Sequence, residues 1–272
     1  MIFGIEWQLG LELLVLGLAT GFMAGLLGIG GGMLLVPFLT WLLAGQGIPT
    51  EYVVKMAIAT SLATICFTSV SSVRSHHKRG AVRWDVFKLL APGIVVGSLL
   101  GAQIVRVLPS SALALVFAAF VGFSGVQMLL DRKPKPTRQL PGTAGMLGAG
   151  SGIGMASALL GAGGGFISVP FMTWCNVPIH KAVATSAALG FPIALAGTVG
   201  YIVAGWSLEG MPAGALGFIY LPALLLIAVA SVLTAPVGAR VAHSLNVREL
   251  KRAFALLLFV LAGYMLYKGL SG

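Results

Sequence analysis

Ten apolar stretches follow one another along the chain, and most of them are about 20 residues long. A helix rises about 1.5 Å per residue, so a stretch of this length crosses the hydrocarbon core of a bilayer. The second and seventh stretches are shorter and begin with glycines. The sequence therefore predicts an all-α polytopic membrane protein with segments at roughly 9–29, 31–45, 52–73, 86–106, 111–130, 143–162, 164–176, 181–205, 215–240 and 250–268.

The composition excludes the main soluble classes. Of the 272 residues, 58% are apolar and 9% are charged, whereas soluble domains are about 25% charged. An ordinary cytosolic enzyme, a disordered chain and a nucleic-acid-binding module are therefore excluded. Cys66 and Cys175 have no metal or redox spacing, and we expect no cofactor. The N-terminal region carries Glu6 and Glu12 but no basic residue, so we expect no cleaved signal peptide.

The basic residues are distributed unevenly. Fourteen of the 17 lie in four connections that ten crossings place on one side of the membrane. Basic loops face the cytoplasm, so this distribution places both termini outside the cell. We expect the protein in the inner membrane of a bacterial cell. This distribution accounts for most of the net charge of +10 without an anionic partner such as nucleic acid. The fourteen are Arg74, Lys78, Arg79, Arg83, Lys88, Arg132, Lys133, Lys135, Arg138, Lys181, Arg240, Arg248, Lys251 and Arg252.

The chain contains an internal duplication. Residues 27–41 (LGIGGGMLLVPFLTW) and 160–174 (LGAGGGFISVPFMTW) are identical at ten positions in one register. Ala-Thr-Ser at 59–61 recurs at 184–186. The predicted halves are 1–131 and 140–272, joined by a cytoplasmic linker at 132–139. Each half holds five segments, an odd number, so the second half enters the membrane in the opposite orientation, as in inverted-repeat transporters.

The glycine clusters of the duplication predict a broken or re-entrant element in each half. Gly disfavours helix by up to about 1 kcal/mol relative to Ala, and Pro37 and Pro170 each remove a backbone donor soon afterwards. A helix break at membrane depth exposes N–H groups and a positive helix end, which together bind anions. We therefore expect the substrate at Gly30, Gly31, Gly32, Gly163, Gly164 and Gly165. Helix packing is the alternative for these clusters, and we assign it to the regularly spaced Gly17, Gly21, Gly25, Gly93, Gly97 and Gly101.

Four hydroxyl side chains are further candidates for the substrate site: Thr60, Ser61, Thr185 and Ser186. They either ligate an oxyanion or bond backbone groups of their own helix. Lys55 and Lys181 precede them and either supply charge at a cavity mouth or extend to the membrane surface.

At these residues the sequence resembles the sulfite exporter TauE/SafE family of bacterial membrane proteins. The resemblance rests on the paired Gly-x-Gly-Gly-Gly…Val-Pro stretches at 28–37 and 161–170, on residues 59–62, on the loop at 77–84 and on the glycines of 92–102. It implies a transporter of small sulfur-containing or carboxylate anions, such as sulfite, sulfoacetate and related organic acids.

The predicted function is a secondary transporter, by direction an exporter, that moves such anions by alternating access. A passive anion channel and an uptake permease for the same substrates are the alternatives. No ATP-binding motif occurs, so an ion, proton or substrate gradient supplies the energy. The predicted partners are a small anion and the lipid bilayer; a coupling proton or ion and a homo-oligomer are left open. No acid pair, His cluster or Ser-His arrangement lies within the spans, which argues against an intramembrane enzyme.

Overall fold

The computed structural model describes residues 6–27, 31–130, 137–208, 210–242 and 247–271, and most of these residues are helical. Eight of the helices are long and apolar enough to cross a membrane, which confirms the expected all-α multi-pass fold. The two shorter ones, α2 and α7, begin at the glycine clusters. The helices are α1 (Trp7–Leu27), α2 (Gly32–Ala44), α3 (Thr50–Lys78), α4 (Trp84–Val107), α5 (Ser110–Leu130), α6 (Thr143–Leu160), α7 (Gly165–Trp174), α8 (Ile179–Gly205), α9 (Leu221–Ala242) and α10 (Val247–Ser271).

The ninth predicted segment, 215–240, is wrong at its beginning. Residues 215–220 form a two-stranded antiparallel hairpin, β1 (Ala215–Leu216) and β2 (Ile219–Tyr220), and helix α9 starts only at Leu221. Gly214 and Gly217 have φ angles of 84° and 58°. A right-handed helix does not pass through such left-handed residues, although the segment is as apolar as a span.

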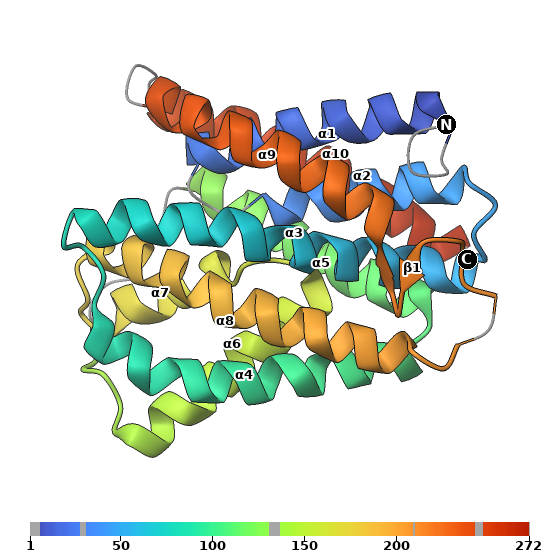
Figure 1. Ribbon diagram of the computed structural model, residues 1–272. Coiled ribbons are helices and arrows are strands. Elements are labelled where there is room, and N and C mark those ends of the chain that lie inside the picture. Colours follow the sequence, from blue (N-terminus) through green and yellow to red (C-terminus); the bar gives the residue numbers. More distant parts are fainter. Residues whose placement is uncertain (1–5, 28–30, 131–136, 209, 243–246, 272) are drawn as a thin grey trace.

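The helices are arranged so that each half of the chain packs on the other (Figure 1). Helices α1 and α9 lie along one edge, α4 and α6 along the opposite edge, and α3 and α8 between them. Helix α5 packs on α10. The first half therefore contributes one helix to each of these four pairs and the second half the other.

Two of these helix pairs approach to backbone contact through glycine. In α4, a β-carbon added at Gly93 or Gly97 would overlap the carbonyl groups of Leu147 and Ser151 in α6. In α1, a β-carbon at Gly17 would lie 2.7 Å from the β-carbon of Ala230 in α9. These contacts confirm the packing role predicted for Gly17, Gly93 and Gly97, because small residues allow membrane helices to approach closely.

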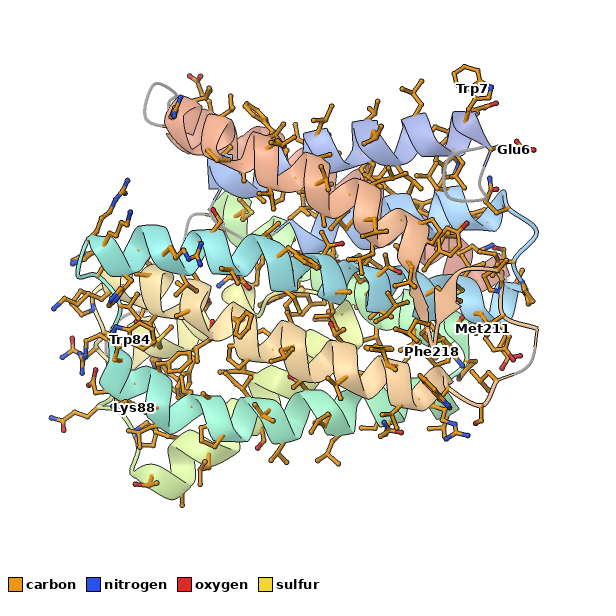
Figure 2. All side chains as sticks on the ribbon, in the orientation of Figure 1. Glu6, Trp7, Trp84, Lys88, Met211 and Phe218 are labelled. Atoms are coloured by element: carbon orange, nitrogen blue, oxygen red, sulfur yellow. The ribbon has the colours of Figure 1, made fainter. Side chains whose placement is uncertain are left out.

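The two ends of the helical bundle differ. Trp84 and Lys88 lie at one end, and Trp7 and Met211 lie at the other (Figure 2). We call the first the basic end, where α3 connects to α4, and the second the termini end, where α1 begins and α10 ends. Helix α2 extends to the termini end and α7 to the basic end (Figure 1). The two short helices thus run from the interior toward opposite ends.

Candidate anion site at two helix breaks

The two helix breaks have the same local geometry. Gly31 precedes α2 with φ 63° and ψ −16°, and Gly164 precedes α7 with φ 75° and ψ −3°. Each glycine carbonyl accepts the first backbone hydrogen bonds of the helix that follows it. A left-handed residue at this place favours glycine, which has no β-carbon. The duplicated glycines therefore end one segment and start a new helix inside the protein, as predicted. Gly30 lies outside the described residues.

The two breaks contact each other. A β-carbon at Gly32 would overlap the carbonyl oxygen of Gly161, the residue that ends α6 with φ 62°. A β-carbon at Gly161 would in turn lie 2.7 Å from Cγ2 of Val36 in α2. The hydroxyl of Ser61 in α3 donates to the Gly161 carbonyl at 2.8 Å. Helix α3 therefore binds the break of the other half directly.

The start of α7 presents polar groups that lack partners among the described residues. The backbone N–H groups of residues 163–166 donate to no described acceptor. Ser157 in α6 is 1% exposed, and its buried hydroxyl makes no hydrogen bond within the described part of the chain. A β-carbon at Gly164 would lie 3.0 Å from this hydroxyl. Free N–H groups, a helix N-terminus and a buried hydroxyl are what a small anion requires.

A small cavity lies at the same place. Its volume is about 10 Å³, and its lining includes Ser157 and residues 162–167, which is room for about one water molecule. No carboxylate is among its described lining residues. The cavity as it stands is too small for an organic anion, so binding one there requires the surrounding helices to move apart.

Two serines connect this break to α8. Ser168 and Ser186 are buried, and their hydroxyl oxygens lie 2.7 Å apart. Ser168 also donates to the carbonyl oxygen of Gly164 at 2.9 Å. Since a serine has one hydroxyl proton, Ser186 must donate to Ser168 in this arrangement. Ser186 therefore lies beside the break with its hydroxyl proton donated to Ser168, and its role in binding the substrate stays a prediction.

Thr60 and Thr185 each bond a backbone group outside the two breaks. The Thr60 hydroxyl accepts the backbone N–H of Tyr220, just before α9, at 3.1 Å. The Thr185 hydroxyl accepts the N–H of Arg83, just before α4, at 2.9 Å. Phe218 and Trp84, which neighbour these donors in sequence, lie at opposite ends of the bundle (Figure 2). The partner of each threonine is thus a helix start in the other half, which neither sequence alternative anticipated.

Arg83 carries charge at the basic end. Its guanidinium donates to the Asp85 carboxylate, with which it forms an ion pair. This hydrogen bond raises the pKa of Arg83, so the side chain stays protonated. Tyr220 takes the corresponding place at the other threonine, Thr60. Burial raises the pKa of Tyr220, which keeps its hydroxyl neutral. The two helix starts that the threonines bind therefore differ in charge.

Two residues of the candidate site, Ser157 and Ser168, were not predicted from the sequence. In the duplicated register they stand opposite Ala24 and Leu35. The signal was present as polar residues in the second half where the first half is apolar. Their positions make the break before α7 more polar than the break before α2.

The fold and the paired breaks define a helical multi-pass membrane protein of the kind that transporters use, with broken helices near the middle of the bundle. The chain belongs to the sulfite exporter TauE/SafE family, whose family model matches residues 13–265. It is a membrane transporter, and its family is not one of enzymes.

Curated relatives agree with this assignment. A probable membrane transporter protein of Haemophilus influenzae is 38% identical over 257 residues, which cover 94% of this chain and 97% of that protein. The probable membrane transporter protein MJ0441 of Methanocaldococcus jannaschii is 26% identical and covers 93% of this chain and 94% of its own. YunE of Bacillus subtilis, with the same description, is 30% identical over 71% of this chain and 78% of its own. No solved structure matches the chain.

Proposed function

We propose that the protein is a secondary carrier that exports small sulfur-containing or organic anions, with sulfite, sulfoacetate and short sulfonates or carboxylates as its substrate class. The observation that supports this most is the start of α7, where the Ser157 hydroxyl and four backbone N–H groups lack described partners. These groups donate hydrogen bonds, and the helix end is positive. An oxyanion satisfies both properties, and a cation satisfies neither.

The break before α2 forms the second part of the proposed site. Gly31 has the conformation of Gly164, and Gly32, Gly163 and Gly165 leave the backbone open to a ligand because they lack side chains. Ser61, Ser186 and the hydroxyl protons of Thr60 and Thr185 complete the donor set as the helices move. A hydrogen bond to a charged group contributes about 1.5–3 kcal/mol, so a few of them give micromolar-to-millimolar affinity after desolvation.

The proposed mechanism is alternating access by two inverted halves, 1–131 and 140–272, joined by the linker at 132–139. The reciprocal packing supports it: α1 pairs with α9 as α6 pairs with α4, and α3 and α8 pair with each other. The exchange of Thr60 and Thr185 bonds between halves follows the same relation. A proton, ion or substrate gradient drives the cycle. A passive channel is the alternative, and it predicts no trans-stimulation of flux.

The proposed orientation places the basic end in the cytoplasm of a bacterial cell and the termini end outside the inner membrane. The basic residues of the α3–α4 connection support it, since such residues are retained on the cytoplasmic side. With this orientation α7 extends toward the cytoplasm, and its open N-terminus faces the interior of the protein.

Calorimetry on the purified protein in lipid nanodiscs tests the substrate class. Sulfite, sulfoacetate and acetate are compared with ammonium and alkylammonium ions of matched size. We expect heat of binding for at least one of the oxyanions and for none of the cations. The heat should disappear in Gly164→Leu, because the side chain would overlap Ser157 and Ile193. Gly148→Leu, where a β-carbon meets nothing within 4 Å, is the matched control. Saturable binding of a cation with no response to any anion would contradict the proposal.

A further inference from the structure

Three basic residues do not follow the positive-inside distribution, and all three line one pocket. Lys55, Arg106 and Lys268 are the basic residues that remain after the fourteen in the basic connections. They belong to α3, α4 and α10, which together with the start of α5 enclose a surface pocket of about 360 Å³. The pocket lies at the termini end, where α4 ends and α5 begins (Figure 1). Its volume falls at the lower end of the range for ligand sites, about 300–1,000 Å³.

Lys55 is held in an unfavourable place for a cation. It is 2% exposed and lies in the second turn of α3, near the positive end of that helix. Its Nζ donates to the carbonyl oxygen of Arg106 at 3.2 Å and lies 5.9 Å from the centre of the Phe218 ring. A side chain this buried does not extend freely into water, which favours charge at a cavity mouth over extension to the membrane surface.

The pocket has an excess of positive charge. Glu51 is the one carboxylate among its described lining residues, against three cations. Within the described part of the chain, none of these three cations forms an ion pair with a carboxylate. The N-terminus of α5 adds a further partial positive charge, since Pro109, Ser110 and Ser111 line the pocket. A buried cation without a full partner is costly, and a bound anion would remove that cost.

We propose that this pocket is a second anion site, which takes a small oxyanion of the sulfonate, sulfate or carboxylate class at the termini end. Its lining shares no residue with the cavity at α7, so the two sites are separate and the pocket does not rest on the proposed central site. In the proposed orientation it holds and concentrates anions at the outer face. A cluster of like charge in a cleft attracts ions of the opposite sign in this way.

Charge-selective thiol labelling tests the pocket. Ser111→Cys is placed in a Cys66→Ala, Cys175→Ala background in nanodiscs and treated with two methanethiosulfonate reagents, an ethylsulfonate anion and an ethyltrimethylammonium cation. We expect the anion to be favoured by at least about tenfold relative to the same ratio at Ser207→Cys, an exposed position. Arg106→Gln with Lys268→Gln should abolish the preference, whereas Lys88→Gln at the basic end should leave it unchanged.

Protection by sulfoacetate distinguishes a site from a positive potential. We expect sulfoacetate to slow labelling of Ser111→Cys with saturation, and choline at equal ionic strength not to do so. This test keeps Lys55, Arg106 and Lys268 in place, so it does not depend on the folding of the Gln variants. Protection should persist when Ser157→Ala is added, even if transport fails. An equal rate for both reagents, linear rather than saturable protection, or loss of protection with Ser157→Ala would each overturn the second site.

Discussion

Ser157 is the residue whose surroundings most strongly indicate a binding site. A buried polar group without a partner costs about 1–3 kcal/mol, and this one lies beside a helix N-terminus with open N–H groups. A ligand oxygen that accepts from Ser157 would offset the cost when it binds. Selection for a stable fold alone would favour alanine here, as at Ala24 in the first half.

Replacing this hydroxyl should therefore separate binding from stability. We expect Ser157→Ala to weaken oxyanion binding by about tenfold, the equivalent of a hydrogen bond to a charged group at the lower end of its range. The free energy of unfolding should be unchanged or slightly higher. Calorimetry and thermal unfolding measure the two quantities. Ser124→Ala, which removes a buried hydroxyl bonded within α5, is the control and should leave binding unchanged. Equal affinity in Ser157→Ala would remove this hydroxyl from the site.

Thr185 joins the two halves through one hydrogen bond, and its loss should be measurable. Thr185→Val keeps the shape but leaves the Arg83 N–H without its acceptor. We expect the free energy of unfolding to fall by about 1–3 kcal/mol. Thr185→Ser retains the hydroxyl and should restore most of that stability. Denaturant unfolding in detergent measures both. If Val and Ser gave the same stability, the hydrogen bond would not be what holds α4 to α8.

At the scale of the elements, backbone contact between α4 and α6 depends on glycine. A β-carbon at Gly97 would overlap the Ser151 carbonyl, so we expect Gly97→Ala to lower the free energy of unfolding by about 1–3 kcal/mol, as overpacking does. Gly152 in α6 has nothing within 4 Å of such an atom. Gly152→Ala should be neutral or stabilising by up to about 1 kcal/mol, because alanine favours helix. A fluorescence-based unfolding curve for each variant makes the comparison, and equal effects would contradict the packing account.

The two short helices depend on a single left-handed glycine each. Gly31→Ala meets atoms only at 3.3 Å, so its expected cost comes from its φ of 63° and amounts to about 1–2 kcal/mol. Gly164→Ala adds an overlap with Ile193 at 2.5 Å and should be the more destabilising. Thermal unfolding ranks the two variants. The reverse order would show that the break before α2 is the tighter of the two.

At the scale of the whole molecule, the proposed inverted halves determine which connections lie on the same side of the membrane. We expect cysteines introduced at positions 78 and 135 to react with an impermeant reagent only from the cytoplasm, and one at position 209 only from outside. The experiment uses intact cells and inside-out vesicles in a background without the native cysteines. Reaction of 78 and 135 from opposite sides would contradict the inverted halves.

Much of the fold was predictable because a segment that crosses the bilayer, such as α5 or α8, must be a helix of about 20 mostly apolar residues. Their length and apolar composition fix them as helices, and the duplicated glycines located both breaks. The hairpin at 215–220 was missed because Phe218 and Ile219 are apolar, like the residues of a membrane-spanning helix. Only Gly214 and Gly217 indicate the turn. The hydrophobicity of a segment does not indicate whether its backbone is helical or forms a hairpin.

The site was less predictable, because its contacts join residues far apart in sequence. Ser61 was expected at the site, but its acceptor, the Gly161 carbonyl, follows only from how the halves pack. Thr185 and Arg83 are likewise joined only in the folded chain. Lys55, Arg106 and Lys268 line one pocket. In the sequence, they share only their position outside the four basic connections.

Counterflow in proteoliposomes tests the central claim, anion transport through the breaks, most directly. Vesicles loaded with unlabelled sulfite or sulfoacetate are diluted into the labelled anion, and its uptake is followed over time. We expect transient accumulation of the labelled anion above equilibrium in the wild type, and a strong reduction in Gly164→Leu but not in Gly148→Leu. Equilibration without accumulation would indicate a channel. Counterflow of a cation, with none for any anion, would contradict the account.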